Sequence, residues 1–229
     1  MSPTANDVIL SAECFLWDFD GCFADTERLH FLAYHEAFSH FGHQISEASY
    51  YPSFTHLGDG TRREIQSHGL NISEEEIGRL KFEAYARLIR QGPVSCFPET
   101  LELVRLMRAR GARVAIASNS SEDEIRTVLG TAGFPLDELD LIVGKRSDLR
   151  KKPSPDIFLH ALQVLNCQPG RSIVLEDSNR GLQAAAAAEC AAIWMRTRYN
   201  DTLASGEQRI GEFSHAQLLE LFRSMPAKK

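Results

Sequence analysis

The chain has 229 residues, of which 43% are hydrophobic and 24% are charged, and its formal net charge is −6. This composition is ordinary for a folded globular protein and argues against a disordered chain. The length suits one sizeable core, or a core with a small inserted domain. The acidic balance gives no reason to expect a nucleic acid or an anionic membrane as partner.

The five cysteines are scattered without a Cys-x-x-Cys pair. An odd, scattered set favours a reduced chain over a disulfide framework and gives no support for zinc. The N-terminal sequence MSPTANDVIL has no basic region and no long apolar run, and no stretch approaches the ~20 apolar residues of a membrane span. We therefore expect a cytoplasmic protein with no membrane partner. The sequence does not indicate whether the protein is a monomer or an oligomer.

The first predicted strand is the apolar run Cys14 to Trp17, which ends at Asp18. Between residues 25 and 93 the hydrophobic pattern has only helical periods, covering residues 27–41, 61–67 and 74–90. The segment Ser73 to Glu76 has the form of a capping box for the last of these helices.

From about residue 94 the pattern alternates between helices and strands. The predicted helices are 99–110, 121–132, 155–165 and 181–188, and the predicted strands are 113–117, 139–143, 172–175 and 191–195. Such alternation implies right-handed βαβ units, a parallel sheet and helices on both of its faces. We predict an α/β core formed by residues 1–24 and 94–229, with residues 25–93 inserted after the first strand as a helical cap domain.

Asp18 and Asp20 follow the first strand, where the apolar run stops and Gly21 begins. Ligands of open α/β sheets bind beyond the carboxyl ends of the strands, and residues two apart can face the same side. Two crowded carboxylates resist joint ionisation unless a metal or a lysine neutralises them. Taken alone, the pair also fits a strand end with solvated acids.

The next strand runs into Ser118 and Asn119, whose hydroxyl, amide and nearby helix N–H groups suit an anion. The alternative is an N-cap, because Ser and Asn are favoured capping residues. We favour the capping interpretation for Ser120 or Ser121, and anion binding for Ser118.

Two further strand ends supply charge. Lys152 precedes a proline, so a rigid turn can aim its ammonium group into the crevice while Lys151 stays in water. Glu176 and Asp177 follow the fourth strand, and carboxylates from two strand ends suit Mg²⁺ beside a phosphate. The alternative for Asp177 is a helix cap.

Four segments together resemble the haloacid dehalogenase-like (HAD) phosphohydrolase superfamily: DFDG at 18–21, ASNS at 117–120, KPSPDIF at 152–158 and LEDSNRG at 175–181. The resemblance covers essentially the whole chain and implies a Rossmann-like α/β core. The insert resembles the helical cap of the β-phosphoglucomutase-like branch. The segment Asp25-Thr26-Glu27-x-x-His30 of this chain is closely similar to the hinge sequence of that branch.

The resemblance implies a role for each core residue. Asp18 is the implied nucleophile, which forms an aspartyl-phosphate, and Asp20 is the implied general acid and base. Ser118, Asn119 and Lys152 are the implied ligands of the phosphoryl oxygens.

The resemblance also implies a magnesium cofactor. Its ligands would be Asp18, the main-chain carbonyl of Asp20 and Asp177, with Glu176 bound directly or through water. For the cap, the resemblance points to substrate contacts from Thr26, His30, Arg62 and Lys81.

The leading hypothesis is a magnesium-dependent phosphatase for a small phosphorylated metabolite, for which we expect a sugar phosphate. The alternative is a hexose-phosphate mutase of the β-phosphoglucomutase type, although Gly58 stands where that branch carries lysine. A carbon-halogen hydrolase is disfavoured because that branch lacks the second aspartate and the metal site. A phospho-accepting module without turnover, like a receiver domain, would be about half as long and would lack the cap.

Overall fold

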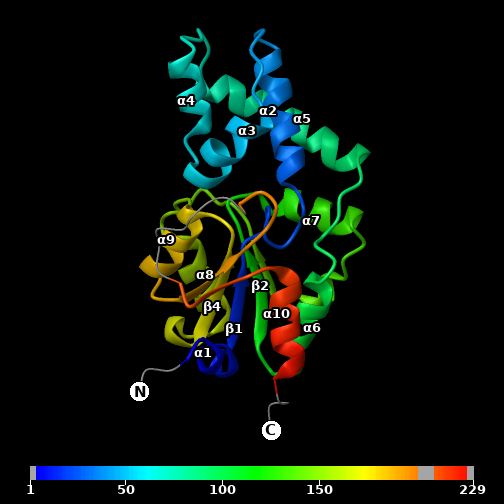
Figure 1. The fold of residues 1–229 in the computed structure, drawn as a ribbon, viewed down its shortest axis with the longest axis vertical. Helices are drawn as coiled ribbons and strands as arrows, with labels where there is room; N and C mark the ends of the chain where they lie inside the picture. Colours follow the sequence, from blue (N-terminus) through cyan, green and yellow to red (C-terminus); the bar gives the residue numbers. More distant parts are fainter. Residues whose placement is uncertain (1–3, 201–208, 226–229) are drawn as a thin grey trace.

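The computed structural model describes residues 4–200 and 209–225. Within them lies a six-stranded parallel sheet with the order β3-β2-β1-β4-β5-β6. Its strands are β1 (Cys14–Trp17), β2 (Arg113–Ala117), β3 (Leu141–Val143), β4 (Ser172–Glu176), β5 (Ala191–Met195) and β6 (Gly211–Phe213). This arrangement confirms the predicted α/β, Rossmann-like fold class (Figure 1).

Strand β1 lies at the centre of the sheet and all four of its residues are buried. Its last residue, Trp17, lies opposite Ile116 of β2 and Leu175 of β4. The three strands therefore end at nearly the same level. The residues that follow them are brought to one edge of the sheet.

Helices cover both faces of the sheet. They are α1 (Ala5–Ser11), α6 (Thr100–Ala109), α7 (Glu122–Thr131), α8 (Asp156–Leu165), α9 (Asn179–Ala187) and α10 (His215–Ser224), with short 3₁₀ turns η2 (Leu136–Glu138) and η3 (Pro169–Arg171). Alternate strand residues face opposite sides. Phe15 and Trp17 pack in an apolar cluster with residues of α6, α7 and α10, whereas Cys14 and Leu16 pack with α8 and α9.

The segment between β1 and α6 is helical, as the hydrophobic pattern predicts. It contains α2 (Glu27–Ser39), α3 (Glu47–Tyr50), the π-helical turn η1 (Tyr51–Leu57), α4 (Gly60–Ser67) and α5 (Glu74–Gln91). These helices stand beyond the carboxyl edge of the sheet, and we call them the cap (Figure 1). The predicted domain limits, 24/25 and 93/94, fall in the connections before α2 and after α5.

The cap has an apolar cluster of its own, formed by Phe31, Ala37, Phe38, Ile45, Tyr50 and Ile77. Other cap residues, including Ala33 and Tyr85, belong instead to the large cluster of the core. The two connections between cap and core run side by side: Asp25 N–H donates to Ser95 O (2.9 Å) and Phe97 N–H donates to Phe23 O (3.4 Å). The cap is therefore attached by paired backbone as well as by packing.

Several elements were not predicted from the pattern. They are α1, α3, η1, β6 and α10, all short or flanked by irregular chain. At α5, Ser73 Oγ accepts a hydrogen bond from Glu76 N–H (3.1 Å), which makes the side-chain cap that the sequence predicts. In the described part of the chain no helix is long and apolar enough to cross a membrane.

The separate cap cluster gives the first prediction. Phe38 is fully buried there, so Phe38→Ala should cost about 3–5 kcal/mol of unfolding free energy, as large-to-small core substitutions do. Hydrogen exchange should rise in α2, α4 and α5 while β1, β2 and β4 keep their protection. An equal loss of protection in cap and sheet would contradict a cap with its own cluster.

Candidate active site

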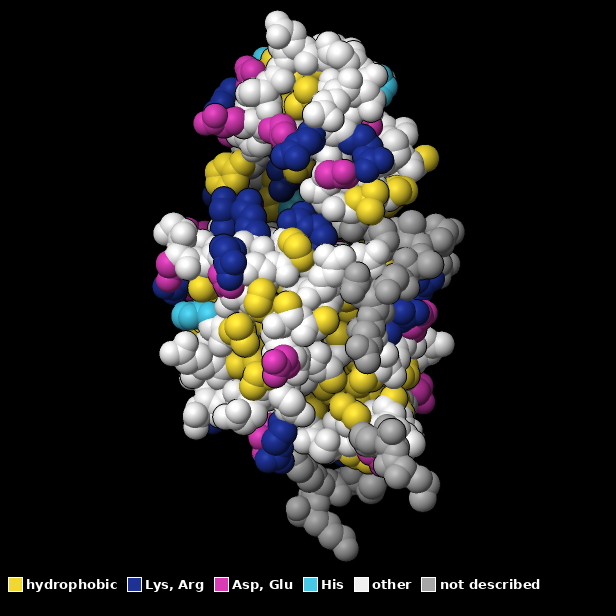
Figure 2. All heavy atoms as spheres, turned by 90° about the vertical axis from the view of Figure 1, so that its left-hand side faces the viewer, with side chains coloured by type: hydrophobic (Ala, Val, Ile, Leu, Met, Phe, Trp, Pro, Cys, Tyr) yellow, Lys and Arg dark blue, Asp and Glu magenta, His cyan; other side chains and the backbone are white. Residues whose placement is uncertain are grey.

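A cavity of about 240 Å³ lies where the cap meets the carboxyl edge of the sheet. The core lines it with Asp18, Asp20, Ser118, Asn119, Lys152, Glu176, Asp177, Ser178 and Arg180, and the cap lines it with Glu27, His30, Tyr34, Tyr50, Phe54, Thr55 and Lys81. Figure 2 shows a hollow at this level, with Lys and Arg side chains around it. The residues predicted from β1, β2 and β4 are thus brought together in one place.

Lys152 connects two of the acidic strand ends. Its buried Nζ donates to Asp18 Oδ1 (2.5 Å) and to Glu176 Oε1 (2.6 Å), and it lies 4.7 Å from the ring centroid of Phe158. Burial acts to lower the pKa of Lys152, but the two carboxylates hold that pKa above its ordinary value. The lysine is therefore a fixed positive charge within the site.

The turn that carries Lys152 is tied down through its backbone. Asn119 Oδ1 accepts a hydrogen bond from the Lys152 N–H (3.0 Å), and Arg180 Nη2 donates to the Lys152 carbonyl oxygen (2.5 Å). Asn119 follows β2, and Arg180 is the second residue of α9, the helix after β4. Residues that follow both strands adjacent to β1 therefore position the lysine. Lys151, the preceding residue, is exposed, as the sequence predicts.

One lysine does not neutralise the acids that surround it. Burial raises the pKa of Asp18 well above its usual range, and Lys152 opposes that shift while Glu176 adds to it. Burial also raises the pKa of Asp177, and the charges of Asp18 and Glu176 raise it further. The cluster is therefore short of positive charge.

The donors of this cluster fit a hard cation. Carboxylate oxygens of Asp18, Glu176 and Asp177 all lie within 4.8 Å of one another. Asp177 Oδ2 is buried and has no hydrogen-bond partner, which is costly unless a ligand satisfies it. Gly21, with φ +75°, leaves room beside it, because a Cβ there would lie 2.4 Å from Asp177 Oδ2. Oxygen donors of this kind are those that Mg²⁺ prefers.

The carboxylate of Glu176 lies against the first turn of α9. Its Oε2 accepts hydrogen bonds from the N–H groups of Asp177 and Ser178 (3.2 Å each) and from Ser178 Oγ (3.0 Å). A Cβ on Gly181 would lie 1.7 Å from the Glu176 carboxyl carbon. The glycine is therefore needed to let this carboxylate occupy its place. Ser178, rather than Asp177, caps α9.

Asp20 faces the cap rather than Lys152. Its Oδ1 accepts a hydrogen bond from Thr26 Oγ1 (2.7 Å) and lies 2.8 Å from His30 Nε2, while Ser120 Oγ donates to Oδ2. Burial acts to raise the pKa of Asp20, but His30, Ser120 and Thr26 hold it below its usual range. The two aspartates of the pair thus occupy different surroundings.

The sequence predicts that Ser120 or Ser121 caps the helix after β2, and the second of these is confirmed. The N-cap of α7 is Ser121, which forms a capping box with Glu124, so Ser120 is free to turn toward Asp20. Ser118 is buried at the end of β2 and lines the cavity, and its Oγ accepts a hydrogen bond from Ser120 N–H (3.1 Å). Both serines therefore belong to the site.

The four residues predicted for the cap are placed differently from one another. Thr26 and His30 contact Asp20, and the His30 ring stacks on Tyr85 with centroids 4.0 Å apart. Lys81 lines the cavity with Nζ 4.6 Å from the Tyr85 ring centroid, and burial lowers its pKa although Asp20 opposes this.

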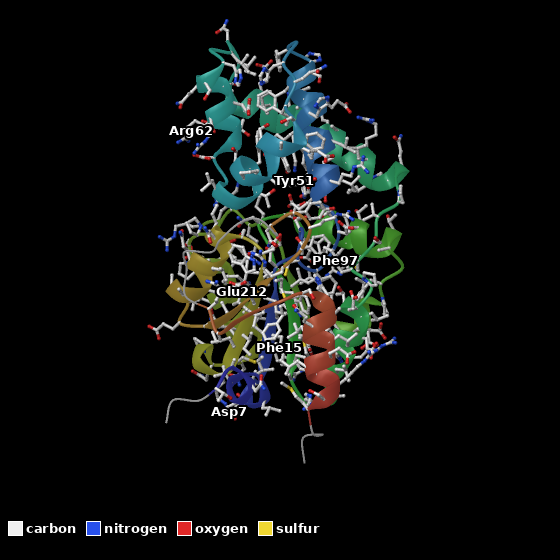
Figure 3. The ribbon with its side chains drawn as sticks, viewed as in Figure 1. Asp7, Phe15, Tyr51, Arg62, Phe97 and Glu212 are labelled. Atoms are coloured by element: carbon white, nitrogen blue, oxygen red, sulfur yellow. The ribbon has the colours of Figure 1, made fainter. Side chains whose placement is uncertain are left out.

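Arg62 is the exception and does not reach the cavity. It lies on the outer side of α4, where its Nε pairs with Glu74 at 2.9 Å and both side chains are about half exposed or more (Figure 3). The register of α4 explains this position, because Gly60 is buried against Phe54 and the next residues turn outward.

Several residues of the cavity were not selected from the sequence. Glu27 is buried and accepts a hydrogen bond from Thr55 Oγ1 (2.6 Å), and Tyr34 and Tyr50 form the wall beside them. Arg180 reaches the cap, where Nη1 lies 3.4 Å from Gly58 O. Glu27 and Arg180 stand within the quoted motifs, but Thr55 carries no sequence signal, since it is set only by the fold of η1.

Comparison with known proteins identifies the class. A family model described as haloacid dehalogenase-like hydrolase matches residues 15–195. That match spans most of the chain, from β1 to β5. The chain therefore belongs to the haloacid dehalogenase-like hydrolases, and it is a phosphatase of that family.

Two relatives and one solved structure show which branch of the family this chain is similar to. Protein CbbY of Rhodobacter capsulatus is 28% identical over 218 residues, which cover 90% of this chain and 96% of that protein. A β-phosphoglucomutase of Mycobacterium bovis is 26% identical over 207 residues, which cover 78% of each chain. The solved structure of a CbbY variant from Rhodobacter sphaeroides, in complex with xylulose-(1,5)bisphosphate, has a TM-score of 0.72 and 29% identity, covering 90% of this chain and 96% of that chain. The similarity to the β-phosphoglucomutase-like branch is thus confirmed.

Gly181 offers a test of the acidic cluster. Gly181→Ala should push Glu176 aside and lower phosphatase activity at least about tenfold, because displacing a charged group by even a small distance removes its contacts. Gly130→Ala is the matched control, since Gly130 lies near the end of α7 and a Cβ there would meet nothing within 4 Å. Equal activity of the two variants in a phosphate-release assay would show that the Glu176 position does not matter.

Proposed function

We propose that this phosphatase hydrolyses a small phosphorylated sugar through an aspartyl-phosphate formed on Asp18, with Mg²⁺ as cofactor. The observation that carries the proposal is the contrast between the two aspartates. Asp18 accepts a hydrogen bond from the buried ammonium group of Lys152. Asp20 instead accepts hydrogen bonds from the hydroxyl groups of Thr26 and Ser120 and lies beside the imidazole of His30. One carboxylate is arranged for attack and the other for proton transfer.

In the proposed first step, a carboxylate oxygen of Asp18 attacks phosphorus while the bond to the leaving oxygen breaks. Lys152 fixes the orientation of Asp18 and supplies positive charge near the oxygens of the transferring group. Ser118 and Asn119, which line the same cavity, offer hydrogen-bond donors to those oxygens. Positioning and charge neutralisation of this kind account for most catalysis of phosphoryl transfer.

Asp20 is the proposed acid and base. Asp20 enters the first step protonated and gives that proton to the leaving oxygen. The ionised Asp20 that results then takes a proton from the water that attacks phosphorus, which breaks the bond between phosphorus and the Asp18 oxygen and releases phosphate. The hydrogen bonds that Asp20 accepts favour its ionised form, which the second step requires. His30 Nε2 lies 2.8 Å from Asp20 Oδ1 and so holds the carboxylate in one orientation.

Asp18, Glu176 and Asp177 are the residues that would hold Mg²⁺, together with the proposed carbonyl of Asp20. The unpartnered Asp177 Oδ2 and the shortage of positive charge support this choice. When bound, the ion neutralises negative charge on the phosphoryl group.

The cap residues that line the cavity favour a substrate with several hydroxyl groups. Glu27 and Thr55 offer polar atoms beside the rings of Tyr34, Tyr50 and Phe54. Carboxylate and hydroxyl groups set in an otherwise aromatic wall suit the hydroxyls of a sugar. Lys81 and Arg180 also line the cavity and could meet a second anionic group, so sugar bisphosphates belong among the compounds to be tested.

The second candidate is a mutase, which Thr26 and His30 beside Asp20 favour. The surroundings of Gly58 argue against it. A Cβ at Gly58, where φ is +74°, would lie 2.1 Å from Arg180 Nη1, so a lysine at this position would displace the arginine. We therefore keep hydrolysis as the proposed reaction.

The proposed roles of the two aspartates can be tested by conservative substitution. Asp18→Asn and Asp20→Asn should each lower kcat by about a thousandfold or more, because an amide neither attacks phosphorus nor transfers the proton. Chelation of Mg²⁺ should lower the activity of the parent protein and magnesium should restore it. Asp137→Asn, on the exposed turn η2, is the control. Parental activity of either active-site variant on p-nitrophenyl phosphate would contradict the mechanism.

The reaction type can be tested with substrates. A panel of sugar phosphates and bisphosphates should release inorganic phosphate, with at least one sugar compound turned over faster than p-nitrophenyl phosphate. Incubation of β-glucose 1-phosphate with catalytic glucose 1,6-bisphosphate should yield phosphate and not glucose 6-phosphate. Accumulation of glucose 6-phosphate would replace the phosphatase by the mutase.

A further inference from the structure

A second group of metal-ligating side chains lies in the cap, apart from the active site. His43 Nε2 lies 3.0 Å from Glu64 Oε2, and His68 Nδ1 lies 3.3 Å from the same oxygen. One ring nitrogen of each histidine and one Glu64 carboxylate oxygen all fall within 4.8 Å of one another. None of these residues lines the catalytic cavity or takes part in the proposed reaction.

Two turns of the chain bring these donors together. The chain reverses direction after α2 at Gly42, whose φ is +74°. His43 N–H then donates back to Phe38 O (3.2 Å) in the last turn of α2. Glu64 and His68 are one helical turn apart at the end of α4, and Gly69, with φ +59°, ends that helix. The site thus joins segments 21 residues apart at the outer end of the cap, farthest from the sheet (Figure 1).

The spacing of the donors fits a small tetrahedral ion. With bonds of roughly 2.1 Å, the edge of such a coordination shell is about 3.4 Å. Two of the three edges, 3.0 and 3.3 Å, are already close to that length. The His43 and His68 rings have centroids 4.6 Å apart, and His68 Nδ1 also lies 3.2 Å from Glu64 O, so a rotation of the exposed His68 ring must release that contact to close the third edge.

The burial of the three side chains favours a site over a surface encounter. His43 and Glu64 are only 14% and 12% exposed, and the His43 ring packs edge-on against Phe38. His68 is 52% exposed, which leaves an entry path and room for a water ligand. Burial of a carboxylate is costly unless a positive charge is beside it, so a cation between Glu64 and the two imidazoles would stabilise this arrangement.

We propose that His43, Glu64 and His68 form a binding site for a divalent transition-metal ion of the Zn²⁺ class. Two imidazoles and one carboxylate suit zinc, copper or nickel, whereas Mg²⁺ prefers the all-oxygen cluster at the active site. Three protein ligands leave a fourth position for water. The ion would fasten the end of α2 to the end of α4 and so stabilise the cap rather than act on the substrate.

The test uses the full chain, freed of metal by chelation and then held in excess Mg²⁺ so that the active-site carboxylates are occupied. Titration with Co²⁺ should show one equivalent bound, with visible absorption bands typical of nitrogen and oxygen ligation, and Zn²⁺ should displace it. Zn²⁺ should also raise the midpoint of thermal unfolding. His68→Gln should weaken binding at least about tenfold, because removal of a ligand costs no less than loss of an outer-shell contact.

His40→Gln is the matched control, because His40 is an exposed histidine at the same end of α2 outside the cluster. It should keep the parental affinity and the parental thermal shift. His43→Gln should lose both, and its unfolding midpoint without metal shows that the variant has folded. The proposal is overturned if His43→Gln and His68→Gln bind Zn²⁺ as the parent does, or if Asp18→Asn rather than these variants removes the bound ion.

Discussion

The arrangement of this molecule depends on charge compensation at the carboxyl edge of its sheet. Asp18, Glu176 and Asp177 are buried together, and their mutual repulsion would destabilise the folded chain without a cation among them. Lys152 meets two of the three directly. The remaining deficit of positive charge, concentrated at Asp177, is the reason why we assign a magnesium ion to the same place.

This constraint accounts for features that look unrelated along the chain. Strands β1 and β4 are adjacent in the sheet although the cap and two other strands lie between them in the chain, and their pairing brings Asp18 beside Glu176. Gly21 and Gly181 leave the room that the carboxylates occupy. Asn200, buried after β5, donates from Nδ2 to Asp177 O and Met195 O (2.9 Å each) and so fixes the loop that carries Asp177.

Five strands of the sheet and the polar residues at its edge could be predicted from the sequence because their signals are local: an apolar strand followed by a polar group. The same reasoning missed Ser120, since a Ser-rich helix start predicts a cap, and only the capping box of Ser121 leaves Ser120 available for Asp20. It could not place Arg62, whose direction depends on how α4 packs on Phe54. Contacts between segments distant in the chain, such as Thr55 of η1 with Glu27 of α2, depend on tertiary packing that no local pattern encodes. The catalytic roles themselves stay predictions.

In the proposed mechanism, the buried carboxylate of Asp18, paired with Lys152, receives the phosphoryl group. Acid quenching of the enzyme during turnover of a phosphorylated sugar, followed by peptide mass spectrometry, tests it most directly. We expect the added mass of one phosphoryl group on the peptide that contains Asp18, and on Asp18 itself after fragmentation. A phosphoryl group on another side chain would contradict the account, as would turnover in a protein whose Asp18 stays unmodified at every quench time.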